Sequence, residues 1–239
     1  MHGRSVATVL TCLLPIALSG CATYSAKPIS ATVVDNDTGR PLEGVNIVVT
    51  WELEYVKMEG FYSESRGEGL MTQMEAVTGS DGKFYIPGWG PAPIPSGLPE
   101  RSMLSPMQPS IRLFKSGYRT HTVGNAWESS YLSNPFYKGP AERASDFDGK
   151  TIPLTPLPEK IKDSEWWIFV NPRLSALMVW DCHWETIPKY LSSLTKERER
   201  IVKQSPRASV SHLPRIEDVE RWRGAERCSS AKALLAAPM

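Results

Sequence analysis

Proline and glycine interrupt this chain so often that long helices cannot dominate its fold. The 239 residues include 20 prolines and 17 glycines. The segments between them are short, rich in β-branched residues and often alternating in polarity. Such segments, bounded by turn residues, are typical of antiparallel β-sandwiches. We therefore predict a mainly β protein built around an antiparallel sandwich.

The overall composition is that of an ordinary globular protein. Hydrophobic residues make up 41% of the chain, charged residues make up 22%, and the formal net charge is +1. These values indicate neither a disordered chain nor a polytopic membrane protein. Because no excess of cations is present to neutralise phosphates, the composition also excludes a strongly basic nucleic-acid binder.

Residues 1–20 have the features of a secretory signal peptide. Arg4 gives a basic start, and an apolar run follows from Ser5 to Leu18. This run has 14 residues, whereas a helix needs about 20 residues to span a bilayer. A basic start, a short apolar run and small residues at the end together predict an export signal that is removed from the mature protein.

The last residues of this signal, Leu18-Ser19-Gly20-Cys21, resemble the lipobox of bacterial lipoproteins. The resemblance implies that Cys21 carries a diacylglycerol and becomes the new N-terminus, so that a lipid anchor attaches the protein to a membrane. Residue 22 is Ala, not the Asp that retains lipoproteins in the inner membrane. We therefore expect the outer membrane, facing the periplasm, with residues 21–27 as a tether. The alternative is a plain secretory signal in which Cys21 is paired or free.

Two cysteines remain after processing. Cys12 leaves with the signal and Cys21 carries the lipid, which leaves Cys182 and Cys228. Outside the cytoplasm, such a pair predicts a disulfide. Closing a loop of this length stabilises a fold by roughly 4 kcal/mol in the chain-entropy model. Metal ligation and a free thiol are the alternatives.

Residues 28–158 carry the strand and turn signals of the sandwich. The alternation of residues places Phe84 and Ile86 on one face of a strand. Seven prolines between 87 and 109 predict a loop over the surface. Prolines also place the last expected strand at a sheet edge. The other expected elements are strands at 29–34, 45–51, 110–114 and 151–157, and a long, partly exposed β-excursion over 52–76.

Three segments of this region resemble the carboxypeptidase regulatory-like domain. They are Val33-Val-Asp-x-x-Thr-Gly-x-Pro-Leu-x-Gly-Val-x-Ile47, Thr78-x-x-Asp-Gly-x-Phe84 and Ile111-x-Leu-Phe-Lys-Ser-Gly-Tyr118. The resemblance implies a transthyretin-like β-sandwich with an accessory role and no catalytic residues to carry over. It is interrupted by insertions at 52–75, 88–109 and 120–148, and it does not reach residues 159–239.

Residues 159–239 are predicted to form a small helical extension. Because this region is short, we expect it to pack on the sandwich and to be closed by the disulfide. The final residues, 232–239, are expected to fray. Apolar residues at helical spacing predict three helices: from Leu174 to Cys182, from Pro188 with a stripe of Tyr190, Leu191, Leu194 and Ile201, and from Arg215 to Arg227 with Ile216, Val219 and Trp222 inward.

The densest group of chemically active side chains is Cys182, His183 and Glu185. These side chains could bind a metal, but zinc needs three or four ligands, and the other mature histidines, His121 and His212, are distant in sequence. We therefore predict a disulfide cysteine with flanking helix residues, and neither a metal nor another cofactor.

Two acidic segments resemble calcium-binding loops only superficially. They are 35–39 and 146–149, and neither has the later bidentate Glu that completes a calcium loop. We interpret both as turns.

Aromatic side chains in expected loops are the remaining candidates for binding. They would stack on sugars or anchor a protein partner, and the alternative is that they pack the long loops onto the sandwich. They are Trp89, Trp127, Tyr131, Phe136 and Tyr137.

These observations predict a lipid-anchored envelope protein that is a non-catalytic interaction module and contacts another envelope protein. One alternative is carbohydrate or peptidoglycan binding through the loop aromatics. Another is an enzyme whose site lies between the sandwich and the helical extension, with His121, His183 and Glu185 as its candidates. No complete catalytic motif supports the enzyme hypothesis.

Overall fold

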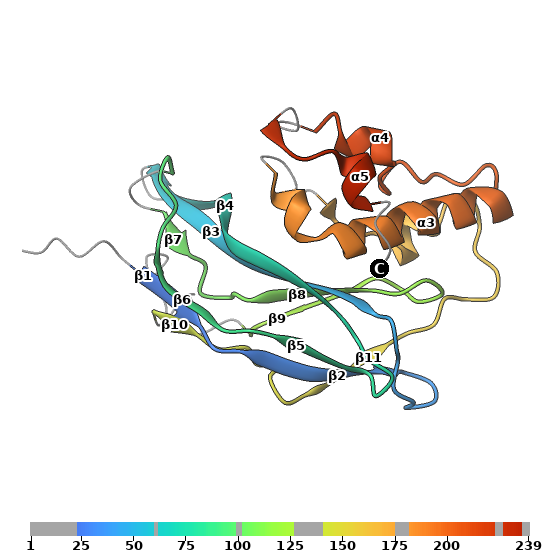
Figure 1. Cartoon of the computed structure of the whole chain (residues 1–239), viewed down its shortest axis with the longest axis horizontal. Coiled ribbons are helices and arrows are strands. Elements are labelled where there is room, and N and C mark those ends of the chain that lie inside the picture. Colours follow the sequence, from blue (N-terminus) through green and yellow to red (C-terminus); the bar gives the residue numbers. More distant parts are fainter. Residues whose placement is uncertain are drawn as a thin grey trace, which may run out of the picture.

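The fold was analysed in a computed structural model of the chain. It describes residues 23–59, 62–98, 102–126, 141–174, 182–222 and 227–235. These residues form three layers, namely two β-layers packed face to face and a set of helices that covers the outer face of the second β-layer (Figure 1). The prediction of a mainly β sandwich with a small helical extension is confirmed.

The first layer consists of two three-stranded sheets that follow one another along the molecule (Figure 1). The β1–β10 and β2–β11 pairs are parallel, which is a difference from a purely antiparallel sandwich. Strand β11 lies at a sheet edge, as its prolines predicted. One sheet has the order β10-β1-β6, and its strands are β1 Thr23–Ala26, β6 Trp89–Pro93 and β10 Glu142–Arg143. The other sheet has the order β11-β2-β5, and its strands are β2 Ile29–Asp35, β5 Lys83–Ile86 and β11 Thr151–Leu154.

The sandwich begins earlier than the sequence indicated. Residues 23–26, which were expected to belong to a tether, form β1 and pair with both β6 and β10. Tyr24 and Ala26 are buried in the sandwich core. Within the described residues, the sandwich therefore begins at Thr23.

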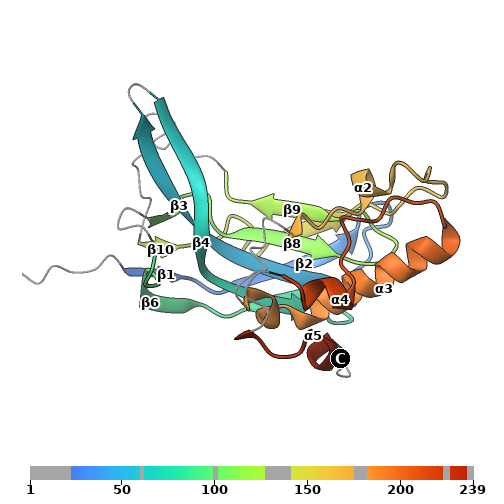
Figure 2. The same cartoon turned by 90° about the horizontal axis from the view of Figure 1, so that it is seen from above.

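The second layer is one sheet with the order β4-β3-β8-β9, in which β7 also pairs with β3. The long excursion predicted over 52–76 is confirmed as the hairpin of β3 and β4, which projects beyond the rest of the sheet (Figure 2). The strands are β3 Asn46–Glu59, β4 Tyr62–Val77, β7 Met103–Leu104, β8 Ser110–Phe114 and β9 His121–Gly124.

The prediction that 87–109 is a surface loop was wrong in two places. Residues Trp89–Pro93 form the edge strand β6, where proline is tolerated because one side of the strand needs no ladder bonds. Met103 and Leu104 form β7 and are almost fully buried. Strand β3 is longer than β8, and its pairing with β8 ends at Thr50. Strand β7 then pairs with β3 at Leu53 and Glu54.

Alternation along the strands divides their side chains between two cores. Because successive side chains of a strand point to opposite faces, Ile47, Val49, Trp51 and Leu53 of β3 face the first layer. The same core contains Phe84 and Ile86, as predicted from their spacing. Val48 lies between Ile47 and Val49 on β3. Its side chain points to the opposite face of the sheet and belongs to a second cluster under the helices.

The third layer covers Val48 and its neighbour Phe114 completely. Phe114 is 1% exposed and contacts Tyr190 of α3 edge to face, with ring centroids 6.2 Å apart. The predicted apolar stripe of the helix beginning at Pro188 is buried in this cluster. The elements of the layer are α2 Trp166–Phe169, the 3-10 helix η2 His183–Thr186, α3 Pro188–Gln204, α4 Ile216–Val219 and α5 Ala231–Leu235.

Other parts of the helical prediction differ from the structure. The helix expected from Arg215 to Arg227 is limited to α4, although Val219 is buried and Ile216 and Trp222 pack against the same cluster. Of the tail expected to fray over 232–239, residues 232–235 instead belong to α5, whose first residue, Ala231, is buried in this core. Residues 236–239 lie outside the described residues. The helix expected before Cys182 lies mostly in 175–181, outside the described residues.

Within the described residues, no helix combines the length and the apolar character needed to cross a bilayer.

Replacing Phe114 with alanine tests whether sheet and helices share one core. Truncating a fully buried Phe removes its transfer free energy and leaves a cavity, so we expect Phe114→Ala to lower the free energy of unfolding by about 3–5 kcal/mol. Tyr85→Ala is the matched control, because Tyr85 is 61% exposed on β5 and should change stability by about 0.5 kcal/mol or less. Equal losses in the two variants, measured by denaturant titration, would contradict this packing.

Candidate functional site

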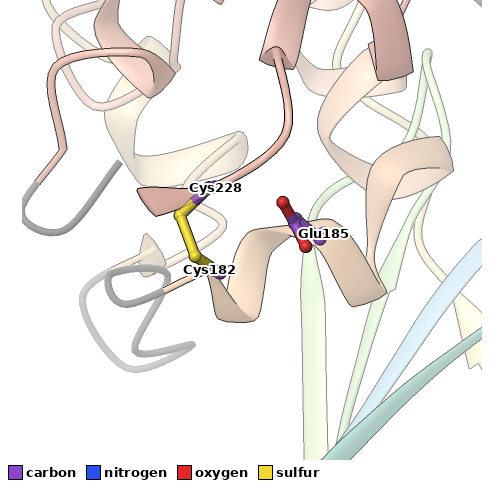
Figure 3. Close-up of side chains that lie close together, drawn as sticks. All are labelled: Cys182, Glu185 and Cys228. Carbon is purple, nitrogen blue, oxygen red and sulfur yellow. A yellow bond between two sulfur atoms is a disulfide. The ribbon is translucent and has the colours of Figure 1, made fainter. Parts of the chain in front are cut away.

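The predicted disulfide is confirmed. Cys182 and Cys228 are joined by a bond of 2.08 Å across 46 positions of sequence (Figure 3). The bond links the start of η2 to the segment that precedes α5, so it closes the helical layer onto itself. Cys228 also packs against the second core.

The same corner contains three potential metal ligands, which are Cys182, Cys228 and Glu185 (Figure 3). Their ligand atoms lie within 4.8 Å of one another. However, both sulfurs are bonded to each other, and a metal needs the thiolate. The carboxylate of Glu185 accepts the backbone N–H of Ser229. In the oxidised protein this corner is therefore a structural closure.

Three polar side chains on the helix-facing side of the second sheet form hydrogen bonds with one another. Arg112 donates to the Thr50 hydroxyl at 2.8 Å and to the Glu52 carboxylate at 3.0 Å. The Thr50 hydroxyl in turn lies 3.1 Å from the same carboxylate oxygen. Arg112 and Thr50 are buried, and a buried charge is tolerated only when it is paired in this way.

Two side chains of β4 fix the start of the helical layer. Gln73 donates to the backbone carbonyl of His183 at 2.6 Å. Helix α3 has no cap from its own N-terminal side chain, and the Glu75 carboxylate accepts the N–H groups of Lys189 and Tyr190 instead, at 3.2 and 3.0 Å. Burial raises the pKa of Glu75 even though these hydrogen bonds oppose the shift. The carboxylate thus supplies a cap that the helix lacks.

The three residues proposed for an enzyme site do not converge. His183 and Glu185 lie on η2, which is bonded to β4, whereas His121 lies on β9. Strands β4 and β9 are at opposite edges of the sheet, separated by β3 and β8. Neighbouring strands are about 4.8 Å apart, so these edges are roughly 14 Å apart.

The acidic segments that resemble calcium loops are turns, and their carboxylates accept hydrogen bonds from within the protein. Asp35 accepts hydrogen bonds from the N–H groups of Asp37 and Thr38 and, at 2.8 Å, from the Tyr118 hydroxyl. These bonds lower the pKa of Asp35, the bond from Tyr118 most of all. Burial and the Asp35 carboxylate raise the pKa of Tyr118 to about 12. In the second segment, Asp146 and Asp148 each accept a backbone N–H.

Trp89 packs against the sandwich. Its ring meets that of Trp51 edge to face at 5.6 Å, and it belongs to the partly buried shell of the first core. This contact favours the packing alternative for Trp89. The other candidate aromatics, Trp127, Tyr131, Phe136 and Tyr137, lie outside the described residues, as does Cys21.

A surface cavity at the β9 edge was not predicted from the sequence. It has a volume of about 450 Å³ and is lined by Thr120, Thr122, Trp167, Ile168, Asn171 and Arg173. Trp167 and Ile168 are 54% and 49% exposed, although both are large and apolar. Residues 166–170 are all apolar, but this single helical turn buries Trp166 and Val170 and directs Trp167 and Ile168 outward.

The polar groups around this cavity divide into two kinds. The Thr120 hydroxyl accepts the Asn171 N–H at 2.9 Å, and the Asn171 side-chain oxygen accepts the Arg173 N–H at 3.0 Å. These bonds join the end of the sheet to the segment after α2. By contrast, the Asn171 amide nitrogen, the Arg173 guanidinium and the Thr122 hydroxyl have no hydrogen-bond partner among the described residues.

The topology explains why these free groups meet at one place. Thr122 pairs with Arg112 across β8 and β9, so it points to the face of the sheet that carries the helices. At β9 that covering ends, because α3 lies over β3 and β8. The cavity is therefore at the border where the covering by α3 stops, because its lining residues come from the β9 edge and from α2 and the segment after it. Figure 2 shows α2 near β9 at this side of the sheet.

Comparisons with known proteins do not assign the chain to a family. No protein-family model matches the chain, and no curated protein sequence matches it significantly. Among solved structures, 3-chlorocatechol 1,2-dioxygenase from Rhodococcus opacus 1CP is similar at 14% identity and a TM-score of 0.33, over 58% of this chain and 62% of that one. A streptococcal ancillary pilin is similar at 13% identity and a TM-score of 0.25, over 57% of this chain and 31% of that one.

A third structure, the dioxygenase Tetur07g02040, is similar at 13% identity and a TM-score of 0.31, over 59% of this chain and 85% of that one. The chain thus spans less than two thirds of the length of the first two proteins. Scores this low assign neither a family nor an activity.

The Tyr118–Asp35 bond predicts a pH-dependent stability. The pKa of Asp35 in the folded protein is below its ordinary value of 3.8, so the stabilisation is present above that pH and is lost as pH falls through the folded-state pKa. We expect Tyr118→Phe to lower the melting temperature at neutral pH and the deficit to shrink in acid. Tyr85→Phe, at an exposed position, is the control. A Tyr118→Phe deficit of equal size at neutral pH and at about pH 2.5 would contradict the assignment.

Proposed function

We propose that this protein is a lipid-anchored protein of the cell envelope, held at Cys21, and that its sandwich and helical layer form a non-catalytic binding module. The observation that carries the binding role is the surface cavity beside Trp167. Between the sheet and the helices, Arg112 and Gln73 donate structural hydrogen bonds. By contrast, three hydrogen-bonding groups without partners among the described residues border an exposed indole at the surface.

The proposed anchor also gives the module an orientation. Only residue 22 separates Cys21 from β1, and two residues of chain reach about 7 Å at most. A lipid on Cys21 would therefore hold the β1, β6 and β10 end of the sandwich directly at the membrane. Helix α2 lies towards the other end of the molecule (Figure 2), so the cavity would face away from the bilayer. In an outer-membrane lipoprotein it would face the periplasm.

The resemblance to the carboxypeptidase regulatory-like domain supports an accessory role. Its first segment covers the end of β2, the Asp35 turn and the start of β3, its second ends in β5, and its third begins in β8. These segments supply strands and turns of the sandwich. None of them contributes a side chain to the cavity.

Replacing Cys21 tests the anchor. We expect Cys21→Ser to abolish incorporation of a clickable fatty acid in growing cells and to move the protein out of the detergent phase, because the acceptor sulfur is gone. Cys12→Ser is the matched control, since Cys12 lies in the same signal but outside the lipobox. Labelling of Cys21→Ser at the wild-type level would refute lipidation at this residue.

Site-specific photo-crosslinking in cells tests the binding role. A photoreactive residue at Ile168 should capture one discrete adduct, because this position borders the cavity. The same residue at Tyr85 is the control, since that side chain is 61% exposed on the other sheet. An identical adduct pattern at the two positions, or no adduct at Ile168, would contradict a binding role for this surface.

A further inference from the structure

The cavity at the β9 edge combines the features that recognise a sugar ring. Pyranose rings present an apolar face of C–H groups surrounded by hydroxyl groups, and aromatic side chains provide a flat apolar surface that such a face can cover. Trp167 offers an indole that is more than half exposed. Around it, the Thr122 hydroxyl and the Asn171 amide are available for hydrogen bonds to hydroxyl groups.

The volume and composition of the cavity favour a small polar ligand over a protein side chain. Its volume of about 450 Å³ is within the range of small-molecule sites. Four of its six lining residues are polar, whereas the energetic centre of a protein interface is a well-packed, desolvated pocket. Hydrogen bonds fix the backbone on both sides, from Asn171 to Thr120 and from Arg173 to Asn171, so the free groups are positioned before a ligand binds.

The charge of the cavity indicates an acidic ligand. Arg173 is the one charged residue that lines it, no carboxylate does, and the Arg173 guanidinium has no ion-pair partner among the described residues. A guanidinium matches the geometry of a carboxylate through two parallel hydrogen bonds. A neutral sugar would leave this charge unused.

We propose that the cavity bordered by Trp167 and Arg173 binds a glycan that carries carboxylate groups. This inference rests on the proposed binding function and specifies its ligand. Trp167 stacks on the sugar ring, Asn171 and Thr122 bond to its hydroxyl groups, and Arg173 pairs with the carboxylate. Two sources share this chemistry, namely peptidoglycan fragments, whose muramic acid and stem peptides bear carboxylates, and polysaccharides that contain uronic acids.

The experiment uses the full-length protein in detergent and isothermal titration calorimetry. The probes are soluble muropeptides, oligosaccharides of polyguluronate, and maltohexaose as a neutral glycan. We expect at least one acidic probe to bind more tightly than maltohexaose, and this binding to weaken as salt is raised. Binding of muropeptides alone would identify peptidoglycan as the source, and binding of polyguluronate alone would identify uronic acids.

Four variants separate the roles of the side chains. Trp167→Ala should weaken binding of the acidic probe about tenfold or more, since truncating a central aromatic anchor has effects of this size. Arg173→Gln should weaken binding of the acidic probe about tenfold while leaving maltohexaose unchanged. Tyr85→Ala and Lys83→Gln, an exposed aromatic and an exposed cation on β5, should leave both unchanged. Each variant is first checked for an unchanged melting temperature.

The inference is overturned if no acidic probe binds the wild-type protein, or if Trp167→Ala and Arg173→Gln bind it as the wild type does. A protein adduct at Ile168 in cells without any glycan binding would also overturn it, but would leave the proposed binding function in place. If the photoreactive residue at Ile168 gives no adduct in cells, the proposed function itself is contradicted.

Discussion

The structure depends on a central sheet that is buried on both faces. Strands β3 and β8 direct Ile47, Val49, Ile111 and Leu113 into the sandwich, and the residues between them point under the helices. Val48 and Phe114 are almost fully buried there. Without the helical layer these apolar side chains would be exposed to water, and without the sheet the apolar stripe of α3 would have no partner. We therefore expect the sandwich and the extension to unfold as one unit.

This arrangement also determines where the molecule can bind. Under the helices, Arg112, Glu52 and Thr50 satisfy one another, and Glu75 caps α3, so these groups serve the fold. The covering ends at β9, where the same face of the sheet reaches the surface next to α2. Trp167 is exposed at this border, and the Asn171 amide nitrogen and the Arg173 guanidinium have no hydrogen-bond partner among the described residues. The proposed site is thus a consequence of where the helical layer stops.

Local patterns in the sequence predicted the elements whose signals are local. Alternation identified the buried face of β5, helical spacing identified the buried stripe of α3, and counting cysteines identified the Cys182–Cys228 bond. Strand β7 could not be predicted from local patterns. It forms where β3 extends beyond the end of β8, and its position depends on pairing with β3, which is distant in sequence. The cavity was missed for a similar reason, since the run 166–170 is uniformly apolar and only packing distinguishes buried Trp166 from exposed Trp167.

Native-state hydrogen exchange of the intact, oxidised protein tests the central claim of a shared core. Amides in the middle of β3, β8 and α3 should exchange with the same free energy of opening, equal to that of global unfolding, because losing either layer exposes the core of the other. The same amides should respond to denaturant with a common slope. If the amides of α3 instead exchange through a smaller opening while β3 and β8 stay protected, the helical layer is a separate unit and the account is wrong.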